Sequence, residues 1–191
     1  CDLKCEELNV DTMAQKIKVV FLCLPHHEAM ETAAAFRKKD IIVIDLSADF
    51  RIKDSATYEK WYGPHSQKPL INEAVYGLPE LHRTEIKQAK LIASPGCYAT
   101  TNILSLAPLL KNALINPTNI ICDSKSGVSG AGRSASVDNL YSEVNDSFKA
   151  YKVGCHRHTP EIEQELSLLA KKPVTLLFSP HLVPMDRGIF S

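Results

Sequence analysis

The stretch Ser94-Pro95-Gly96-Cys97-Tyr98-Ala99-Thr100-Thr101 joins two apolar segments of different length. The short run at 91–93 predicts a strand, and the longer run at 103–114 predicts a helix. The Pro-Gly pair between them is typical of a sharp turn. We therefore expect Cys97 to lie where a strand passes into a helix, in the first turn of that helix.

A cysteine in this position has an environment that favours its thiolate. The unpaired N–H groups and the macrodipole of a helix N-terminus attract an anion, which lowers a thiol pKa from about 8.5 towards neutrality. Because the thiolate is the nucleophilic form, we hypothesise that Cys97 attacks an acyl carbon. A buried structural cysteine is the alternative, and the preceding Pro-Gly turn favours the nucleophile.

An earlier part of the chain indicates a parallel sheet. Residues 18–24 predict a strand buried on both faces, residues 28–38 an Ala-rich helix and residues 41–44 a second buried strand. This order is typical of a βαβ unit, so the fold class is α/β with a doubly wound, Rossmann-like parallel sheet. Ligands bind at the carboxyl ends of such strands, where Pro25 and the polar stretch 45–51 are placed.

The doubly wound sheet is expected to be incomplete. A dinucleotide fold needs a glycine-rich turn after its first strand, and the first glycine of this sequence is Gly63. We therefore expect a fragment that lacks the first β-loop-α unit. Residues 1–17 are polar and without periodicity, and we interpret them as a frayed end rather than as a metal or redox site of Cys1 and Cys5.

Two domains are predicted. The first domain covers residues 1–117 and includes the Cys97 helix, and a turn at Asn116-Pro117 starts the second domain, residues 118–191. Further elements are expected as helices at 55–62, 80–88, 136–151 and 160–172, the last with Thr159 as its cap, and as strands at 119–124 and 174–178.

A glycine-rich loop follows the strand at 119–124. Three glycines within residues 126–133 predict a flexible loop whose backbone approaches a ligand closely. Such a loop could cradle a phosphate, although it lacks the Lys-Ser/Thr ending of a P-loop. A plain connecting loop is the alternative.

A nucleophilic Cys97 also needs a group that accepts its proton. The cluster His156-Arg157-His158-Thr159-Pro160-Glu161 precedes a predicted helix and supplies two candidates, with a solvated loop histidine as the alternative. His26 and His27 could line the same cleft, and we interpret His65 and His82 as surface residues. A Cys-His protease is the competing hypothesis.

Composition excludes several classes of protein. The formal net charge is 0 and 45% of the residues are hydrophobic, so nothing indicates nucleic acid as a partner. No apolar run approaches the ~18 residues of a membrane-spanning helix. The six cysteines lack C-x-x-C spacing, which predicts free thiols, no metal and a reducing, cytoplasmic location; Cys23 and Cys122 are interpreted as core.

Six segments of this sequence match the motifs of a known family, and they stand in the same order as in that family. They are Val-Ile-Asp-Leu-Ser-Ala-Asp-Phe-Arg (43–51), Tyr-Gly-Leu-Pro-Glu-Leu (76–81), Ser-Pro-Gly-Cys-Tyr (94–98), Ser-Gly-Val-Ser-Gly-Ala-Gly-Arg (126–133), His-Arg-His-Thr-Pro-Glu-Ile (156–162) and His-Leu-Val-Pro-Met (181–185). Together they closely resemble the N-acetyl-γ-glutamyl-phosphate reductases of arginine biosynthesis, which are related to aspartate-semialdehyde dehydrogenases.

The resemblance implies NADPH-dependent reduction of N-acetyl-γ-glutamyl phosphate to N-acetylglutamate semialdehyde and phosphate through a thioester. It implies that Cys97 is the nucleophile and His158 the acid–base residue, with His156 as the less favoured alternative. It also implies substrate contacts by Arg51, Ser94 and His156, and cofactor contacts by Pro25, Ser126, Gly127, Ser129 and Gly130. The resemblance further implies that residues 1–117 are a truncated NADP-binding domain and that residues 118–191 are a truncated α+β catalytic and dimerisation domain with a mixed sheet. A homo-oligomer that associates through the second sheet is expected.

Two other functions stay open at this point. One is an aspartate-semialdehyde dehydrogenase, against which the His-Arg-His-Thr-Pro-Glu sequence argues. The other is a truncated homologue without catalysis that serves as a scaffold or interaction module.

Overall fold

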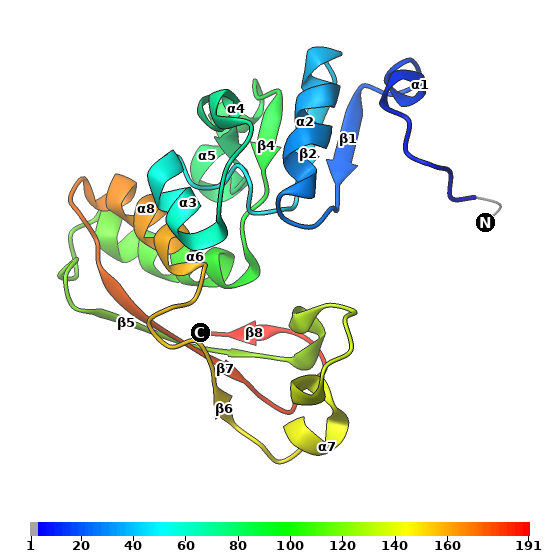
Figure 1. Ribbon diagram of the computed structural model, residues 1–191. Helices are drawn as coiled ribbons and strands as arrows, with labels where there is room; N and C mark the ends of the chain where they lie inside the picture. The colour runs from blue at the N-terminus through cyan, green and yellow to red at the C-terminus, as the bar shows by residue number, and fades with distance from the viewer. Residues whose placement is uncertain (1–3) are drawn as a thin grey trace. The chain divides into compact units, whose positions relative to one another are not determined.

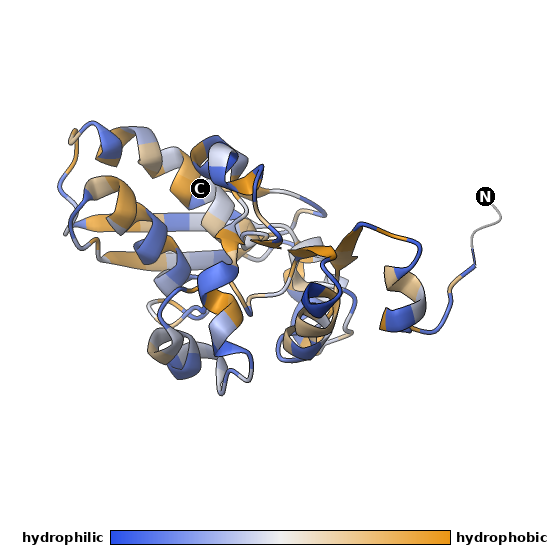
Figure 2. Ribbon diagram, turned by 90° about the horizontal axis from the view of Figure 1, so that it is seen from above, coloured by the Kyte–Doolittle hydropathy of each residue, from blue (hydrophilic) through white to orange (hydrophobic). Residues whose placement is uncertain are grey.

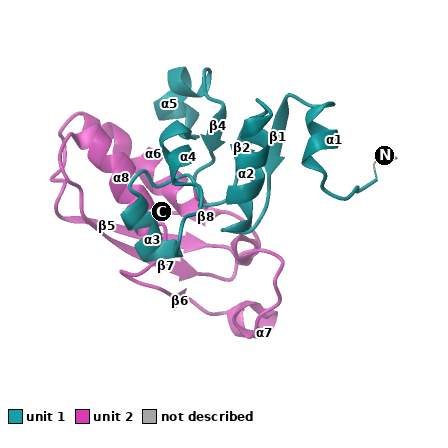
Figure 3. Cartoon of the chain, turned by 45° about the horizontal axis from the view of Figure 1, so that its top comes forward, with its two compact units in different colours: residues 1–95 teal, residues 96–191 magenta. Residues whose placement is uncertain are grey.

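A computed structural model describes residues 4–191, so Cys1 lies outside the described part. The chain forms two compact units, one up to Pro95 and the other from Gly96 onwards (Figure 3). This division comes earlier than the boundary expected at residue 117. The physical reason is that helix α6 (Cys97–Lys111) packs against helix α8 (Thr159–Ala170) and so belongs with the second unit.

The first unit is built on a parallel sheet, as predicted (Figure 1). Its strand order is β1-β2-β4-β3, and each neighbouring pair is parallel. The strands are β1 (Val19–Leu22), β2 (Ile42–Asp45), β3 (Val75–Tyr76) and β4 (Leu91–Ala93). The helices are α1 (Val10–Ala14), α2 (Glu28–Lys38), α3 (Ser55–Tyr62), α4 (Lys68–Glu73) and α5 (Pro79–Ile86).

Strand β1 is buried on only one face, and the prediction of burial on both faces is wrong. Val20 and Leu22 join the core with Phe36 of α2, whereas Val19 is 42% and Phe21 65% exposed. β1 is the edge strand of the described sheet, and the exposure of these two side chains shows that nothing in residues 4–191 covers its second face. Figure 2 shows hydrophilic and hydrophobic residues mixed along the helices, a pattern typical of helices that bury one face.

Three smaller predictions for the first unit are also wrong. A short helix, α1, forms within the segment interpreted as a frayed end, and Asn9 caps it by accepting a hydrogen bond from the N–H of Thr12. His65 is buried rather than at the surface, because its Nε2 lies 2.7 Å from the carbonyl oxygen of Asp49, and His82 is half-buried. Cys23 is exposed, because β1 ends at Leu22.

The second unit contains the predicted mixed sheet. Its order is β6-β7-β5-β8, with β5 and β7 parallel and the two outer strands antiparallel to their neighbours. The strands are β5 (Ile120–Ser126), β6 (Lys149–Ala150), β7 (Leu176–Leu182) and β8 (Ile189–Phe190). Short helices η1 (Val128–Ala131), η2 (Val137–Asn139) and α7 (Tyr141–Val144) complete the unit with α6 and α8.

The helix expected at 136–151 does not form. Residues there make η2, α7 and β6 instead, and Asp146 has a left-handed backbone (φ 55°) that interrupts any helix. Val137 and Phe148 are 70% and 63% exposed, so this segment has no buried helical face, and pairing of β6 with β7 decides its structure.

Within residues 4–191, no helix has the length and apolar character needed to cross a bilayer. The same residues contain no group of three or more His, Cys, Asp or Glu side chains arranged to hold a metal ion.

Candidate active site

Cys97 is the first residue of α6, which confirms the position predicted from the sequence. Its side chain is exposed, and β4 ends at Ala93, four residues earlier. Gly96 is the cap residue, with an extended backbone (φ −66°, ψ 151°). The carbonyl oxygen of Gly96 accepts hydrogen bonds from both the N–H and the hydroxyl of Thr100. These bonds fix the helix start at the cysteine.

A buried carboxyl group holds the peptide that precedes Cys97. The N–H of Gly96 donates to Oε1 of Glu161 over 2.8 Å, and Glu161 is 0% exposed. Glu161 lies in the first turn of α8, where the helix macrodipole stabilises negative charge. The starts of α6 and α8 are therefore joined through one hydrogen bond.

His158 packs directly against Gly96. A Cβ atom on Gly96 would lie 2.5 Å from Nε2 and 2.8 Å from Cε1 of His158, which is closer than any real contact. Only glycine therefore lets the imidazole approach the turn. Thr159 was expected to cap α8, but the helix already includes Thr159, so His158 is its cap residue.

His156 supports His158 and stays neutral. Its Nδ1 accepts the main-chain N–H of His158 over 3.0 Å, and its ring centroid lies 5.1 Å from that of Phe178 and 5.6 Å from that of Tyr98. Burial lowers the pKa of His156 to about 3, and the nearby charges of His158, Lys152 and Arg157 lower it further in the same direction. A ring with this pKa does not carry protons near neutral pH.

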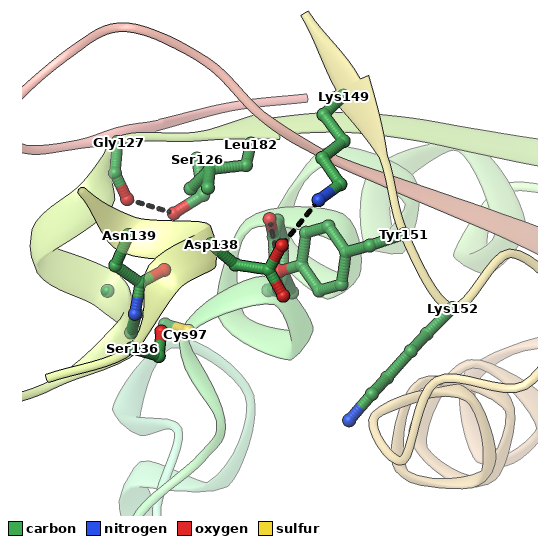
Figure 4. A pocket seen from close by; sticks show the side chains of 13 residues that line it. Cys97, Ser126, Gly127, Ser136, Asp138, Asn139, Lys149, Tyr151, Lys152 and Leu182 are labelled. Carbon is green, nitrogen blue, oxygen red and sulfur yellow. Dashed lines mark hydrogen bonds and ion pairs between the residues drawn. The ribbon is translucent and has the colours of Figure 1, made fainter. Parts of the chain in front are cut away.

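Cys97 opens onto a cavity of about 330 Å³ within the second unit (Figure 4). Three of the residues expected at the cofactor, Ser126, Gly127 and Gly130, line it, whereas Ser129 lines a separate hollow. The remaining lining residues are Tyr98, Ala131, Ser136, Asp138, Asn139, Lys149, Tyr151, Lys152 and Leu182.

Part of the glycine-rich segment forms a short helix instead of the irregular loop that was expected. Residues 128–131 form the short helix η1, and the N–H groups of Val128 and Ser129 donate to the carbonyl oxygens of Met185 and Asp186 over 2.9 and 3.0 Å. A Cβ on Gly127 would lie 2.8 Å from the oxygen of Asp186, so this glycine serves chain packing. The amides of Val128 and Ser129 are thus used within the protein rather than turned to a phosphate.

Two tyrosine hydroxyls form part of the cavity wall. The hydroxyl of Tyr151 donates to that of Tyr98 over 2.9 Å, and the Tyr98 hydroxyl donates to the carbonyl oxygen of His181 over 3.3 Å. Burial raises the pKa of both tyrosines above their ordinary value. Both hydroxyls therefore keep their protons, and both protons are already donated.

The other predicted site residues belong to the first unit. Arg51 is 6% exposed, and its Nε and Nη2 donate to the carbonyl oxygens of Ser94 and Leu46 over 2.6 and 2.7 Å. The structure thus brings Arg51 and Ser94 together through the main chain of Ser94. Pro25 is exposed in the connection between β1 and α2.

The two histidines after β1 are used by the loop that follows β2. Nδ1 of His26 accepts the N–H of Ala48 over 3.0 Å, and the N–H of His27 donates to the carboxylate of Asp49 over 3.0 Å. Asp49 also accepts the hydroxyl of Tyr58. These contacts tie the carboxyl ends of β1 and β2 to each other.

Several residues of the cavity were not found from the sequence. Tyr98 directly follows the nucleophile and Tyr151 precedes the histidine cluster, so proximity in sequence was an available signal for both. The sequence around Lys149, Lys152 and Asp138 contains no recognisable motif. Only the folding of the chain places these residues in the same cavity wall as Cys97.

Comparison with known families identifies the class of protein. The model described as "Semialdehyde dehydrogenase, NAD binding domain" matches residues 1–89, and the model described as "Semialdehyde dehydrogenase, dimerisation domain" matches residues 97–191. The chain therefore belongs to the semialdehyde dehydrogenase family.

Within that family its relatives are N-acetyl-gamma-glutamyl-phosphate reductases, which confirms the resemblance. It is 60% identical to the enzyme of that name from Citrifermentans bemidjiense and 56% identical to that from Syntrophobacter fumaroxidans. Each match covers 100% of this chain and 56% of the relative. The chain thus spans little more than half the length of the relatives it matches.

Solved structures support the fold. Aspartate semialdehyde dehydrogenase II from Vibrio cholerae matches with a TM-score of 0.63 at 14% identity, covering 92% of this chain and 54% of that one. Aspartate semialdehyde dehydrogenase with NADP from Candida albicans matches with a TM-score of 0.57 at 12% identity, covering 90% of this chain and 48% of that one. At these identities the likeness concerns the fold alone.

The described residues do not fit a complete dinucleotide. A bound pyrophosphate needs a glycine-rich turn and free amides at a helix N-terminus. The connection from β1 to α2 contains no glycine, and the N–H of His27, the cap residue of α2, already donates to Asp49. Residues 4–191 therefore supply no cradle for the pyrophosphate at this helix.

The contact between Gly96 and His158 leads to a first prediction. Gly96→Ala should lower the free energy of unfolding by about 1–3 kcal/mol, because the new Cβ overlaps the imidazole. Urea denaturation of Gly96→Ala, His158→Ala and the double variant measures this effect. If overlap with the imidazole is the cause, adding His158→Ala to Gly96→Ala should restore most of the lost stability. Losses that simply add in the double variant would contradict this explanation.

The neutral state of His156 leads to a second prediction. Its pKa falls from 6.5 to about 3 on folding, so the unfolded chain binds the extra proton between these values. The stabilising contribution is therefore present above pH 6.5 and is lost as the pH falls towards 3. His156→Asn, which keeps an acceptor for the His158 N–H, should show a smaller loss of stability from pH 7 to pH 5. Equal pH slopes in urea denaturation would exclude His156 as the source.

Proposed function

We propose that this chain carries the acyl-transfer centre of an N-acetyl-γ-glutamyl-phosphate reductase. The full reaction converts N-acetyl-γ-glutamyl phosphate and NADPH to N-acetylglutamate semialdehyde, phosphate and NADP⁺. One observation carries the proposal: an exposed cysteine begins α6 beside a cavity, and a histidine packs on the glycine before it. The named relatives support the same substrate.

The residues present can form an acyl-enzyme. An acyl phosphate is an activated carbonyl compound with phosphate as its leaving group. The Cys97 sulfur attacks the acyl carbon, a C–S bond forms, and the C–O bond to phosphate breaks with its electron pair leaving on phosphate. Amides in the first turn of α6 have no partner within the helix and can stabilise the developing oxyanion, at about 3 kcal/mol for one such donor.

His158 is the proposed acceptor of the thiol proton. Its imidazole lies on Gly96, the residue before Cys97, and the main-chain bond from its N–H to His156 holds its position. His156 is a positioning residue in this proposal, since its Nδ1 is already an acceptor and its pKa is about 3. These two observations favour His158 over His156 for the proton.

Arg51 and Ser94 are assigned a structural role in this proposal, in place of the substrate contact that was expected of them. The guanidinium of Arg51 holds the carbonyl oxygen of Ser94, just before the turn that leads to Cys97. We assign it to fixing that turn. NADPH, when bound, supplies a hydride for the reduction of the thioester. The described residues lack the pyrophosphate cradle, so the chemistry proposed for them ends at the thioester.

A second copy of the chain is the proposed partner. One face of the second sheet leaves apolar side chains exposed. Ile121 of β5 is 72% exposed, Leu177, its partner on β7, is 45% exposed, and Phe190 of β8 is 71% exposed. Residues of the opposite face, Ile120, Cys122 and Phe178, are buried. The match of this unit to a dimerisation domain supports association through the open face.

Acylation of Cys97 provides the direct test of the proposed chemistry. Incubation with N-acetyl-γ-glutamyl phosphate, without cofactor, should add one acyl group and release one equivalent of phosphate, measured by intact mass and a phosphate assay. Cys97→Ser should abolish both without changing the circular dichroism spectrum, and Cys155→Ser, a matched exposed cysteine of the same unit, should change neither. Absence of acylation in the natural sequence would favour a non-catalytic scaffold.

Association through the open sheet face is tested separately. Ile121→Asp should convert the oligomer to monomers, because a carboxylate would be buried without a partner in the interface. Leu168→Asp, at a residue of α8 that is 62% exposed, is the matched control and should leave the mass unchanged. Light scattering after size-exclusion chromatography reports the mass, and an unchanged mass for Ile121→Asp would place the interface elsewhere.

A further inference from the structure

The cavity beside Cys97 contains three charged side chains, and two of them neutralise each other. Lys149 forms an ion pair of 2.6 Å with Asp138, drawn as a dashed line in Figure 4. The third is Lys152, which lines the same cavity. Within residues 4–191 its ammonium group has no ion-pair partner. The cavity wall therefore presents one uncompensated positive charge.

The backbone holds Lys152 in a defined place. The N–H of Tyr151 donates to the carbonyl oxygen of Pro180 over 3.0 Å, and the N–H of Gly154 donates to that of Phe178 over 3.1 Å. Both ends of the turn are thus fixed to β7. Lys152 itself has a left-handed backbone (φ 47°), a conformation that costs free energy for a residue with a side chain. Its place in the cavity wall is set by this turn.

The two tyrosine hydroxyls in the cavity wall are poor donors for an anion. The hydroxyl protons of Tyr98 and Tyr151 are already donated, to His181 and Tyr98 respectively. The Asp138 carboxylate can only accept hydrogen bonds, and the ammonium group of Lys149 is already paired with it. Among the charged groups of the cavity, Lys152 is the one left to meet a negative charge.

We propose that Lys152 binds the α-carboxylate of the acyl phosphate substrate. This inference rests on the proposed function, in which the acyl carbon lies at Cys97, and it places the rest of the acyl group in the cavity beside that residue. That acyl group carries a negative charge at the end remote from the phosphate. Lys152 thereby selects acyl phosphates with a distal carboxylate over those without one, and it acts before any reduction occurs.

Two substrates that differ only in this carboxylate test the proposal. They are N-acetyl-γ-glutamyl phosphate and 4-acetamidobutanoyl phosphate, which lacks the α-carboxylate. The measured quantity is the second-order rate constant for phosphate release coupled to acylation of Cys97, without cofactor. Lys152→Met should lower it about 10- to 100-fold for the first substrate, the range for a lost hydrogen bond to a charged group, and leave it unchanged for the second.

Two further variants sharpen the assignment. Lys152→Arg keeps the charge and should retain most of the preference for the carboxylated substrate. Lys149→Met combined with Asp138→Asn removes both charges of the ion pair and leaves the net charge of the cavity unchanged, so it should have a smaller effect than Lys152→Met.

Each contrary result has a separate meaning. An equal loss for both substrates in Lys152→Met would show that Lys152 acts on the phosphate or on protein structure, and it would overturn the inference. So would an unchanged rate for both, or a larger loss in the Lys149→Met/Asp138→Asn variant. If the natural sequence is acylated by neither substrate, the proposed function fails and the inference fails with it.

Discussion

The hydrogen bond from the N–H of Gly96 to the buried carboxyl of Glu161 is the contact on which the site depends. It joins the first turn of α8 to the residue that caps α6. Because His158 caps α8 and Glu161 follows it by one turn, the same contact carries the imidazole onto Gly96. The cysteine, the histidine and the carboxyl are thus placed by one junction between two helix starts. A glycine is required there, since any side chain would occupy the space of the imidazole.

Charge around this junction is arranged so that each ionisable group has a distinct task. His156 is neutral because it is packed among aromatic rings, and it therefore can hold the main chain of His158 without competing for a proton. The tyrosine pair is kept protonated by burial and forms an uncharged wall. Lys149 is neutralised by Asp138, which leaves Lys152 as the cavity's net charge. This combination suits an anionic acyl group more than a neutral one.

The two faces of the second sheet have different roles. Alternate residues of β5 and β7 point towards α6 and α8 and are buried, while the residues between them lie on an open face. On that open face Asp123 pairs with Lys125 at 2.6 Å and with His181 at 3.0 Å, beside the exposed Ile121 and Leu177. One sheet can therefore support the cavity on one side and the proposed partner copy on the other.

Local sequence determined much of this protein. The strand-turn-helix at Cys97, the parallel sheet of the first unit, the mixed sheet of the second and the family all followed from periodicity, turn residues and six motifs, because these are properties of neighbouring residues. Tertiary structure decided the rest. The division at Gly96 arises from packing of α6 on α8, the break-up of 136–151 from pairing of β6 with β7, and the burial of His65 from its contact with Asp49. Lys152 reaches the cavity only because β7 anchors its turn. Such contacts join residues distant in sequence, and no local pattern records them.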